Sequence, residues 1–165
     1  MSVSSLRTNK EITRIYDRYA DTVYRICLLM LKNAQEAEDA VQNVFIKLMK
    51  YGKDFESDNH IKAWLIVTAK NECRNSLKHW WNSKRTDMES ISEPEYKSEN
   101  PSEGLINEIL KLPDKYKLPL YLHYYEGYTT SEIAGFLKVN ESTLRTRLVA
   151  ARKQLKLLLE VGEDE

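Results

Sequence analysis

The sequence predicts an all-α protein of two small helical domains joined by a flexible linker. Glycines and prolines number only five and four among 165 residues, and no long window alternates apolar with polar residues as a strand would. Apolar residues instead recur at steps of three and four, which places them on one face of a helix. Residues 87–104 break this pattern, because they are rich in Ser, Glu and Pro and hold too few large apolar side chains to fold alone. We therefore expect domains over residues 1–86 and 105–160, with residues 87–104 as an acidic linker.

Charge follows the same division, although the net charge is zero. Residues 1–86 hold 15 Lys or Arg against 10 Asp or Glu, residues 87–108 hold 1 against 7, and residues 109–160 hold 9 against 5. Two basic blocks around an acidic spacer are typical of a protein with two surfaces for a polyanion.

No targeting or membrane segment is indicated. The longest unbroken apolar run, residues 26–31, is far too short to cross a bilayer, and the N-terminus lacks the apolar core of a signal peptide. The two cysteines, Cys27 and Cys73, do not suggest a disulfide framework. We expect a soluble cytoplasmic protein without membrane insertion.

The first domain is expected to contain three helices. An apolar stripe over residues 12–30 marks the first, and Asn33 is expected to cap the second, with Glu36 placed as in a capping box. The stripe of the second helix covers residues 37–49, and Gly52 closes it.

Asp58 or Asn59 is expected to cap the third helix, whose inward residues run from Ile61 to Leu77 and include Trp64. On its other face, polar residues recur about every four positions, where cations attract phosphates and amides bond to unstacked bases. The residues expected at such a DNA-binding ridge are Lys62, Lys70, Asn71, Arg74, Asn75 and Lys78. The alternative is an ordinary solvated helix face. The roles of Trp80 and Trp81 stay open.

The second domain is expected to begin with a helix over residues 105–110. A second helix follows to about Glu126, bent at Pro119 because proline lacks a backbone donor, and Gly127 stops it.

A helix-turn-helix is expected next. Thr130 or Ser131 caps its first helix, Lys138 stands where the turn usually has a left-handed Gly, and Asn140 caps the second helix. The inward residues are Ile133, Ala134, Leu137, Leu144, Leu148 and Ala151. Arginines have the fork geometry to pair with guanine in a major groove, and hydroxyls near a helix start suit phosphates. The expected DNA-binding residues are Ser142, Thr143, Arg145, Thr146, Arg147, Val149 and Arg152. A merely solvated amphipathic helix explains the same pattern, so this motif alone leaves both interpretations open.

Three segments, taken in order, resemble bacterial RNA polymerase sigma factors. AEDAVQNVFIKL (37–48) is similar to region 2.2 of the sigma-70 family, which clamps a coiled coil in the largest polymerase subunits. The stretch from Ile61 to Arg85 resembles the promoter-melting helix of that family, and residues 112–155 resemble its −35-reading region 4. The short chain is similar to the extracytoplasmic-function (ECF) group. The polymerase-binding residues that this resemblance implies are Glu38, Asp39, Gln42 and Asn43.

The resemblance also implies finer roles. An Asn at the position of Asn71 helps to hold a flipped −10 base, and the loop over residues 51–60 helps to shape that pocket. Two departures stand out: Asn43 replaces the acid usual after Gln42, while Glu141 and Ser142 replace a small residue and Gly.

We therefore expect a non-enzymatic transcription initiation factor with core RNA polymerase and promoter DNA as partners. Family resemblance adds an anti-sigma factor as a further partner. No cofactor or metal is expected, because His60, His79 and His123 are scattered without the spacing of a metal site. Promoter melting would need no nucleotide hydrolysis, since trapping unstacked bases offsets unpairing. The alternatives are a stand-alone helix-turn-helix regulator with an N-terminal dimerisation or sensing domain, and a degenerate paralogue that only sequesters a partner.

Overall fold

The computed structural model describes residues 7–83 and 104–163, and over these ranges every regular element is a helix. The chain forms two compact units, Met1–Glu93 and Pro94–Glu165. The expected linker lies outside the described residues except for its last residue, Gly104, which begins a helix. The all-helical class is confirmed.

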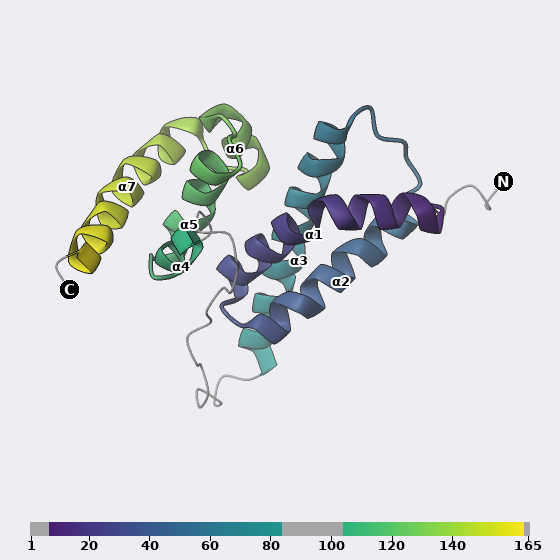
Figure 1. Ribbon diagram of the computed structural model, residues 1–165, viewed down its shortest axis with the longest axis horizontal. Coiled ribbons are helices and arrows are strands. Elements are labelled where there is room, and N and C mark those ends of the chain that lie inside the picture. The colour runs from purple at the N-terminus through teal and green to yellow at the C-terminus, as the bar shows by residue number, and fades with distance from the viewer. Residues whose placement is uncertain (1–6, 84–103, 164–165) are drawn as a thin grey trace. The chain divides into compact units, whose positions relative to one another are not determined.

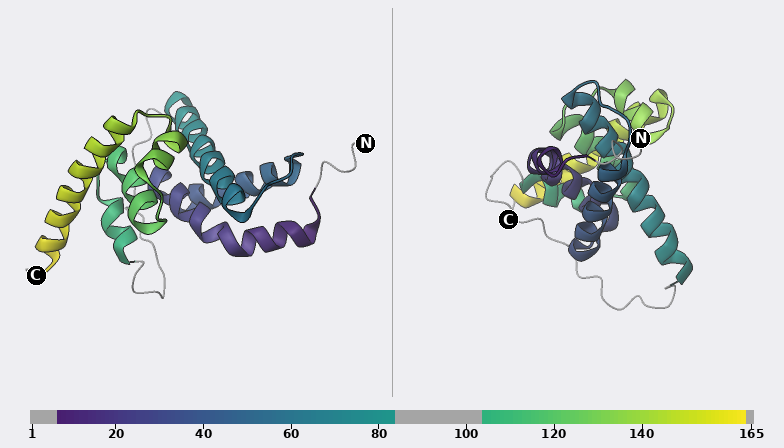
Figure 2. Two further views of the ribbon diagram at one scale, coloured as in Figure 1. Left: turned by 90° about the horizontal axis from the view of Figure 1, so that it is seen from above. Right: turned by 90° about the vertical axis from the view of Figure 1, so that its right-hand side faces the viewer.

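Three helices that all contact one another build the first unit: α1 (Asn9–Leu31), α2 (Ala34–Lys50) and α3 (Asp58–Ser83). Figure 1 shows α1 and α2 running beside each other, and Figure 2 shows the full length of α3. The apolar stripes meet in the centre of this bundle, as expected. Its fully buried residues include Ile15, Val23, Ile26, Ala37, Val44, Leu48 and Ala69.

Two residues of the expected stripes are exposed rather than buried. Tyr16 is 46% exposed and Met49 is 38% exposed, although both were expected to face inward. Tyr16 packs edge-on against Phe45, with ring centroids 4.9 Å apart, so its ring covers the core from outside. Met49 lies in the last turn of α2, one residue before the helix ends at Lys50.

Side-chain caps fix the starts of these helices. Asn33 Oδ1 accepts from the Glu36 amide at 2.9 Å, which confirms the predicted cap of α2. At α3 the prediction of Asp58 or Asn59 is wrong, because the His60 amide donates to Ser57 Oγ at 3.1 Å. Asp58 is instead the first residue of the helix, and its carboxylate binds α1.

The second unit consists of α4 (Gly104–Leu110), α5 (Asp114–Leu120), the π-helix η3 (Tyr121–Tyr125), α6 (Thr130–Leu137) and α7 (Glu141–Glu163). The long helix α7 contacts α4, α5 and α6 and thereby closes the core of the unit. Figure 1 shows α7 extending past these shorter helices toward the C-terminus.

The predicted bend at Pro119 lies next to a change of helix type. Pro119 is inside α5, and from Tyr121 the chain widens into η3, where the Glu126 amide donates to the Tyr121 carbonyl at 3.2 Å, five residues back. Gly127 then ends the segment with φ at +81°, a conformation that glycine adopts without strain. The predicted stop at Gly127 is confirmed.

The helix-turn-helix is present as α6 and α7. Thr129, one residue before the predicted caps Thr130 and Ser131, forms a reciprocal capping box with Glu132, with bonds of 3.1 and 3.0 Å. Lys138 adopts the left-handed conformation (φ 56°, ψ 47°) that the turn usually assigns to glycine. The expected inward residues are buried except Leu137, which is half-buried.

Candidate nucleic-acid interface

The polar ridge expected on α3 does not stay on one face of the helix. Ile66 and Lys70 are 1% and 3% exposed, and Lys62 is half-buried. A step of four residues exceeds one helical turn by about 40°, so a row of such steps winds around the helix. The expectation of a continuous exposed ridge is therefore wrong at Lys70, which turns toward the bundle.

The second half of α3 carries the exposed part of the ridge, namely Asn71, Arg74, Asn75 and Lys78. Two amides and two cations thus lie within two turns of one helix. Cations there attract a nucleic-acid backbone, and amides can both donate to and accept from base edges.

An aromatic cluster joins the loop after α2 to α3. The rings of Tyr51 and Phe55 stack 5.3 Å apart, and Trp64 lies 5.0 Å from Tyr51 and 5.9 Å from Phe55. Trp64, expected inward, is half-buried within this cluster. The guanidinium of Arg7 lies 4.6 Å from the Phe55 ring and donates to the Lys53 carbonyl, so the cluster orders the loop. Tyr51 and Phe55, the aromatic residues of this loop, are the sequence signal from which the cluster could have been predicted.

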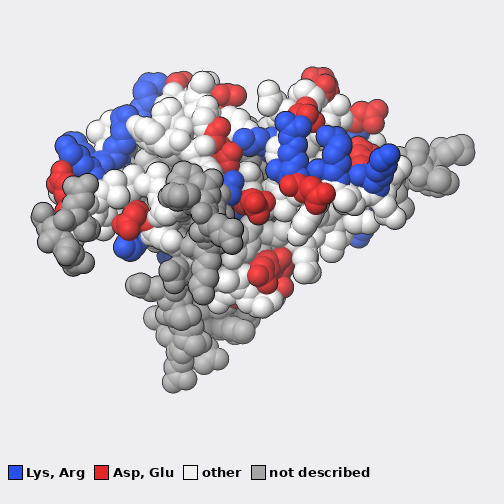
Figure 3. Space-filling model, in the orientation of Figure 1, with Lys and Arg blue, Asp and Glu red and all other residues white. Residues whose placement is uncertain are grey.

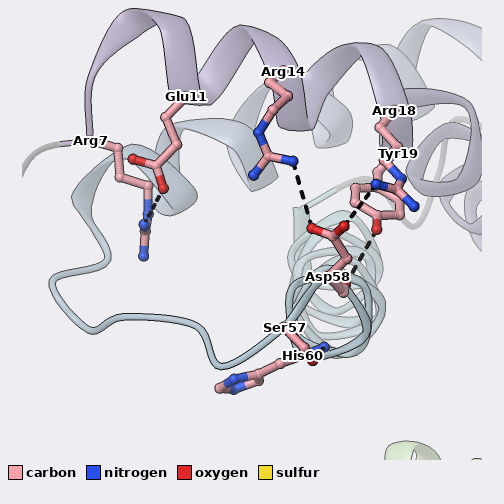
Figure 4. A network of polar contacts seen from close by, with 8 residues as sticks. All are labelled: Arg7, Glu11, Arg14, Arg18, Tyr19, Ser57, Asp58 and His60. Carbon is pink, nitrogen blue, oxygen red and sulfur yellow. Dashed lines mark hydrogen bonds and ion pairs between the residues drawn. The ribbon is translucent and has the colours of Figure 1, made fainter.

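Two arginines of α1 converge on the first residue of α3 (Figure 4). Arg18 Nη1 lies 2.8 Å from Asp58 Oδ2, and Arg14 Nη1 lies 3.6 Å from Oδ1. Tyr19 donates to the Asp58 backbone carbonyl at 3.3 Å. Burial, and secondarily the Asp58 charge, raises the pKa of Tyr19 against the opposing effect of the arginines. Figure 3 shows basic side chains gathered along α1, and the exposed members of this row are Lys10, Arg14 and Arg18.

The two tryptophans near the end of α3 contact each other edge to face at 5.3 Å. Trp81 is 57% exposed, whereas Trp80 is half-buried.

The four residues that the resemblance assigns to polymerase binding share one exposed face of α2: Glu38, Asp39, Gln42 and Asn43. Gln35 Nε2 donates to Asp39 Oδ1 at 3.3 Å along the same helix. Asn43 Nδ2 donates to Glu72 Oε1 at 3.0 Å, and Lys47 Nζ lies 2.6 Å from Glu72 Oε2. Glu72 on α3 was not among the predicted site residues, because nothing in the α2 segment points to it.

The outward face of α7 is exposed where the helix-turn-helix predicts. Its exposed residues are Ser142, Thr143, Arg145, Thr146, Val149 and Arg152, while Arg147 is half-buried. Figure 3 shows basic side chains spread along α7. Two of these arginines are held by neighbours. Arg145 Nη1 lies 3.1 Å from Glu141 Oε1, which also accepts from Thr130 Oγ1 at 3.0 Å.

Arg152 is held by the π-helix. Its Nη1 donates to the Tyr124 hydroxyl at 2.7 Å, and its guanidinium lies 5.9 Å from the centroid of that ring. Tyr124 is 49% exposed and was not predicted as a site residue. The wider turn of η3, which the Pro119 motif alone could not specify, presents this hydroxyl to α7.

Among the described residues there is no group of three or more His, Cys, Asp or Glu able to hold a metal ion. A search of the same residues finds no helix long and apolar enough to span a membrane.

Each of the two units matches the model of a known protein family. Residues 15–82 match the model of sigma-70 region 2, and residues 102–155 match that of sigma-70 region 4. The two matched ranges follow each other in the order that the resemblance required and together cover most of the chain.

Curated relatives agree over nearly the whole length. The ECF RNA polymerase sigma factor SigW of Bacillus subtilis is 27% identical over 159 residues, which covers 86% of this chain and 85% of SigW. SigM of the same organism, also an ECF RNA polymerase sigma factor, is 26% identical, covering 93% of this chain and 98% of SigM.

Solved structures share the fold. The sigma factor RpoE from Bartonella quintana, solved with the anti-sigma factor NepR, matches with a TM-score of 0.70 and 19% identity, over 92% of this chain and 98% of RpoE. CnrH, solved with the cytosolic domain of CnrY, matches with a TM-score of 0.62 and 17% identity, over 93% of this chain and 90% of CnrH.

Neither a stand-alone regulator nor an unrelated helical hairpin accounts for two sigma regions in this order, so those alternatives are not favoured. The chain belongs to the ECF group of the sigma-70 family and directs RNA polymerase to promoters in transcription initiation, without being an enzyme.

Proposed function

We propose that the two units hold separate parts of one promoter while the chain is bound to core RNA polymerase. Residues 1–86 dock on the polymerase and open the −10 element, residues 105–160 hold the −35 duplex, and residues 87–104 span the distance between them. The observation that carries this proposal is a pair of exposed faces in two separate units, one on α3 with amides and cations and one on α7 with hydroxyls and arginines.

In the first unit, docking involves the acidic and amide face of α2, formed by Glu38, Asp39, Gln42 and Asn43. Asn71 holds an unstacked −10 base through its amide, while Arg74, Asn75 and Lys78 bind the backbone and edges of the separated strand. Lys62 lies about two and a half turns before Asn71, on the opposite side of α3, and Lys70 is buried, so neither belongs to this surface. Melting then needs no nucleotide hydrolysis, because binding of the unstacked strand offsets the cost of unpairing.

In the second unit, the first turn of α7 binds phosphates through Ser142 and Thr143, where free backbone N–H groups point at an anion. Arg145 and Arg152 read base edges in the major groove, with Thr146 and Val149 beside them. Arg147, which is half-buried, contacts the backbone of the duplex.

An anti-sigma factor is a further proposed partner. RpoE was solved with the anti-sigma factor NepR, and CnrH with the cytosolic domain of CnrY. The same exposed faces that bind polymerase and DNA would be the surfaces that such a partner covers.

The deciding experiment combines the chain with core RNA polymerase of its source organism, first in gel filtration and then in promoter-dependent transcription. We expect co-elution at low salt, and transcription that falls with Asn71→Ala and with Arg145→Ala. Arg145→Ala should weaken recognition of the −35 sequence by about 1–3 kcal/mol, as loss of a bidentate base contact does. A polymerase that elutes alone would overturn the proposal. An equal loss on a scrambled −35 sequence would show instead that Arg145 contacts phosphate.

A further inference from the structure

Asn43 on α2, which stands where the resembled family usually has an acid, is hydrogen-bonded to Glu72 on α3. In the region 2.2 segments that this helix resembles, an acid is usual at that position, and a carboxylate supplies only hydrogen-bond acceptors to a partner. An amide can present either its carbonyl oxygen or its NH₂ group, so its orientation decides whether it can replace the acid.

Glu72 determines that orientation. A carboxylate only accepts hydrogen bonds, so the amide group facing it must be the NH₂, and Asn43 Nδ2 indeed donates to Glu72 Oε1 at 3.0 Å. The Asn43 carbonyl oxygen, on the other branch of the amide, is thereby turned away from Glu72. Asn43 itself is exposed.

Glu72 is itself held in place. Its other oxygen lies 2.6 Å from Lys47 Nζ, one turn beyond Asn43 on α2, and its side chain is only 13% exposed. The carboxylate therefore bridges two positions of α2 and has little freedom to release Asn43.

We propose that Glu72 is a positioning residue for polymerase docking, which holds the Asn43 amide so that its carbonyl oxygen faces the polymerase as an acceptor. This inference rests on the proposed docking role of the α2 face. It also explains why Asn replaces the acid here. An Asp at position 43 would put two carboxylates about 3 Å apart, where like charges repel strongly.

The inference predicts that Glu72→Lys and Asn43→Asp each weaken polymerase binding, and that the two changes together restore it. In Glu72→Lys, residue 72 becomes a pure donor, so the Asn43 amide turns over and presents its NH₂ group outward. In Asn43→Asp, the outward acceptor is kept, but the carboxylate is repelled by Glu72. In the double variant, the new Asp accepts from the new Lys with one oxygen and presents the other outward.

The test measures the dissociation constant of each full-length variant with core RNA polymerase, alongside its thermal unfolding midpoint. Each single change is expected to weaken binding about tenfold, roughly the effect of one lost hydrogen bond with an unpaired partner. The double variant is expected to return to within about threefold of the wild type. Lys50→Met, which removes an exposed positive charge from the last turn of the same helix without touching Glu72, is the matched control and should bind within about twofold of the wild type.

Three results would overturn the inference. They are a double variant that binds as weakly as the sum of its single changes, a Lys50→Met loss as large as that of Glu72→Lys, and binding that merely follows the unfolding midpoint across the series. Asp39→Ala and Gln42→Ala in the same assay separate this inference from the proposed function. If Asp39→Ala and Gln42→Ala both bind polymerase normally, the proposed docking face itself is wrong. If they bind weakly but the double variant does not regain binding, only the proposed role of Glu72 is wrong.

Discussion

Arg145 Nη1 lies 3.1 Å from Glu141 Oε1, one turn earlier on α7, so the guanidinium proposed to read a base already has a carboxylate partner. Glu141 also accepts from Thr130 Oγ1 on α6, which holds the carboxylate at the start of the recognition helix. A negative charge at that point opposes phosphate regardless of sequence, while the ion pair orients Arg145. We therefore expect Glu141 to favour sequence reading over general attraction to DNA.

Glu141→Gln should accordingly tighten binding of the holoenzyme to DNA of any sequence while reducing its preference for the −35 element. We expect about a two- to fivefold gain on a scrambled −35 duplex, from loss of one nearby repulsive charge in a partly screened setting. Fluorescence anisotropy at two salt concentrations measures it. Glu160→Gln, an exposed change near the other end of α7, is the control and should leave both affinities unchanged. An unchanged ratio between the two duplexes would refute this role of Glu141.

Tyr124 should act through Arg152. Tyr124→Phe keeps the ring beneath the guanidinium but removes the hydroxyl that accepts from Arg152 Nη1 at 2.7 Å. We expect a loss of about 1 kcal/mol in −35 binding, the contribution of one charge-assisted hydrogen bond that orients a reading side chain. Tyr16→Phe, an equally exposed tyrosine in the other unit, controls for general effects of the substitution. The Arg152→Ala background provides the check, because there Tyr124→Phe should have no further effect.

At the start of α3, the stabilisation from a helix cap can be compared with that from an ion-pair cluster. The three side chains of the cluster, Arg14, Arg18 and Asp58, are each about half exposed, so screening keeps the stabilisation small despite the 2.8 Å separation. Asp58→Asn should therefore lower the free energy of unfolding by less than about 1 kcal/mol. Ser57→Ala removes the hydroxyl that accepts from the His60 amide, and loss of a helix cap costs about 1 kcal/mol. Urea unfolding followed by tryptophan fluorescence measures both, and a larger effect of Asp58→Asn would contradict this ranking.

Alkaline pH should destabilise the first unit through two buried groups. A hydrogen bond with Cys27, followed by burial, raises the pKa of the Cys73 thiol well above its ordinary 9.0, and burial raises that of Tyr19 above 10.0. Above pH 9 the unfolded chain releases protons that the folded chain keeps, so the free energy of unfolding falls as pH rises. We expect Cys73→Ala and Tyr19→Phe each to flatten this fall, as measured by urea unfolding between pH 8 and about 10.5. Both cysteines are buried and should resist a thiol reagent until the unit unfolds.

Sequence periodicity was enough to predict the helices, because the apolar stripes of α1, α2 and α7 pack as one-sided faces. Periodicity gave wrong or incomplete predictions where a contact between helices determines the position of a side chain. Lys70 follows the four-residue spacing of its neighbours, yet the slow winding of that row around α3 takes it into the bundle. Glu72 and Tyr124 were missed for a related reason. Each acts on a site residue of another helix, and no spacing within one segment encodes such a contact.

The two left-handed lysines offer the last prediction. Lys32 after α1 and Lys138 after α6 have φ of 57° and 56°, a region that costs a residue with a Cβ atom about 1 kcal/mol and glycine almost nothing. Lys138→Gly should therefore raise the free energy of unfolding of the second unit by up to about 1 kcal/mol, less the entropy that glycine adds to the unfolded chain. Lys32→Gly should do the same for the first unit. All three tryptophans lie in the first unit, at positions 64, 80 and 81, so tryptophan fluorescence follows that unit alone. We expect Lys32→Gly to shift the unfolding transition seen by tryptophan fluorescence. Circular dichroism follows the helices of both units, so Lys138→Gly should shift the circular dichroism transition of the second unit and leave the fluorescence transition unchanged. A fluorescence shift caused by Lys138→Gly would mean that the two units unfold as one.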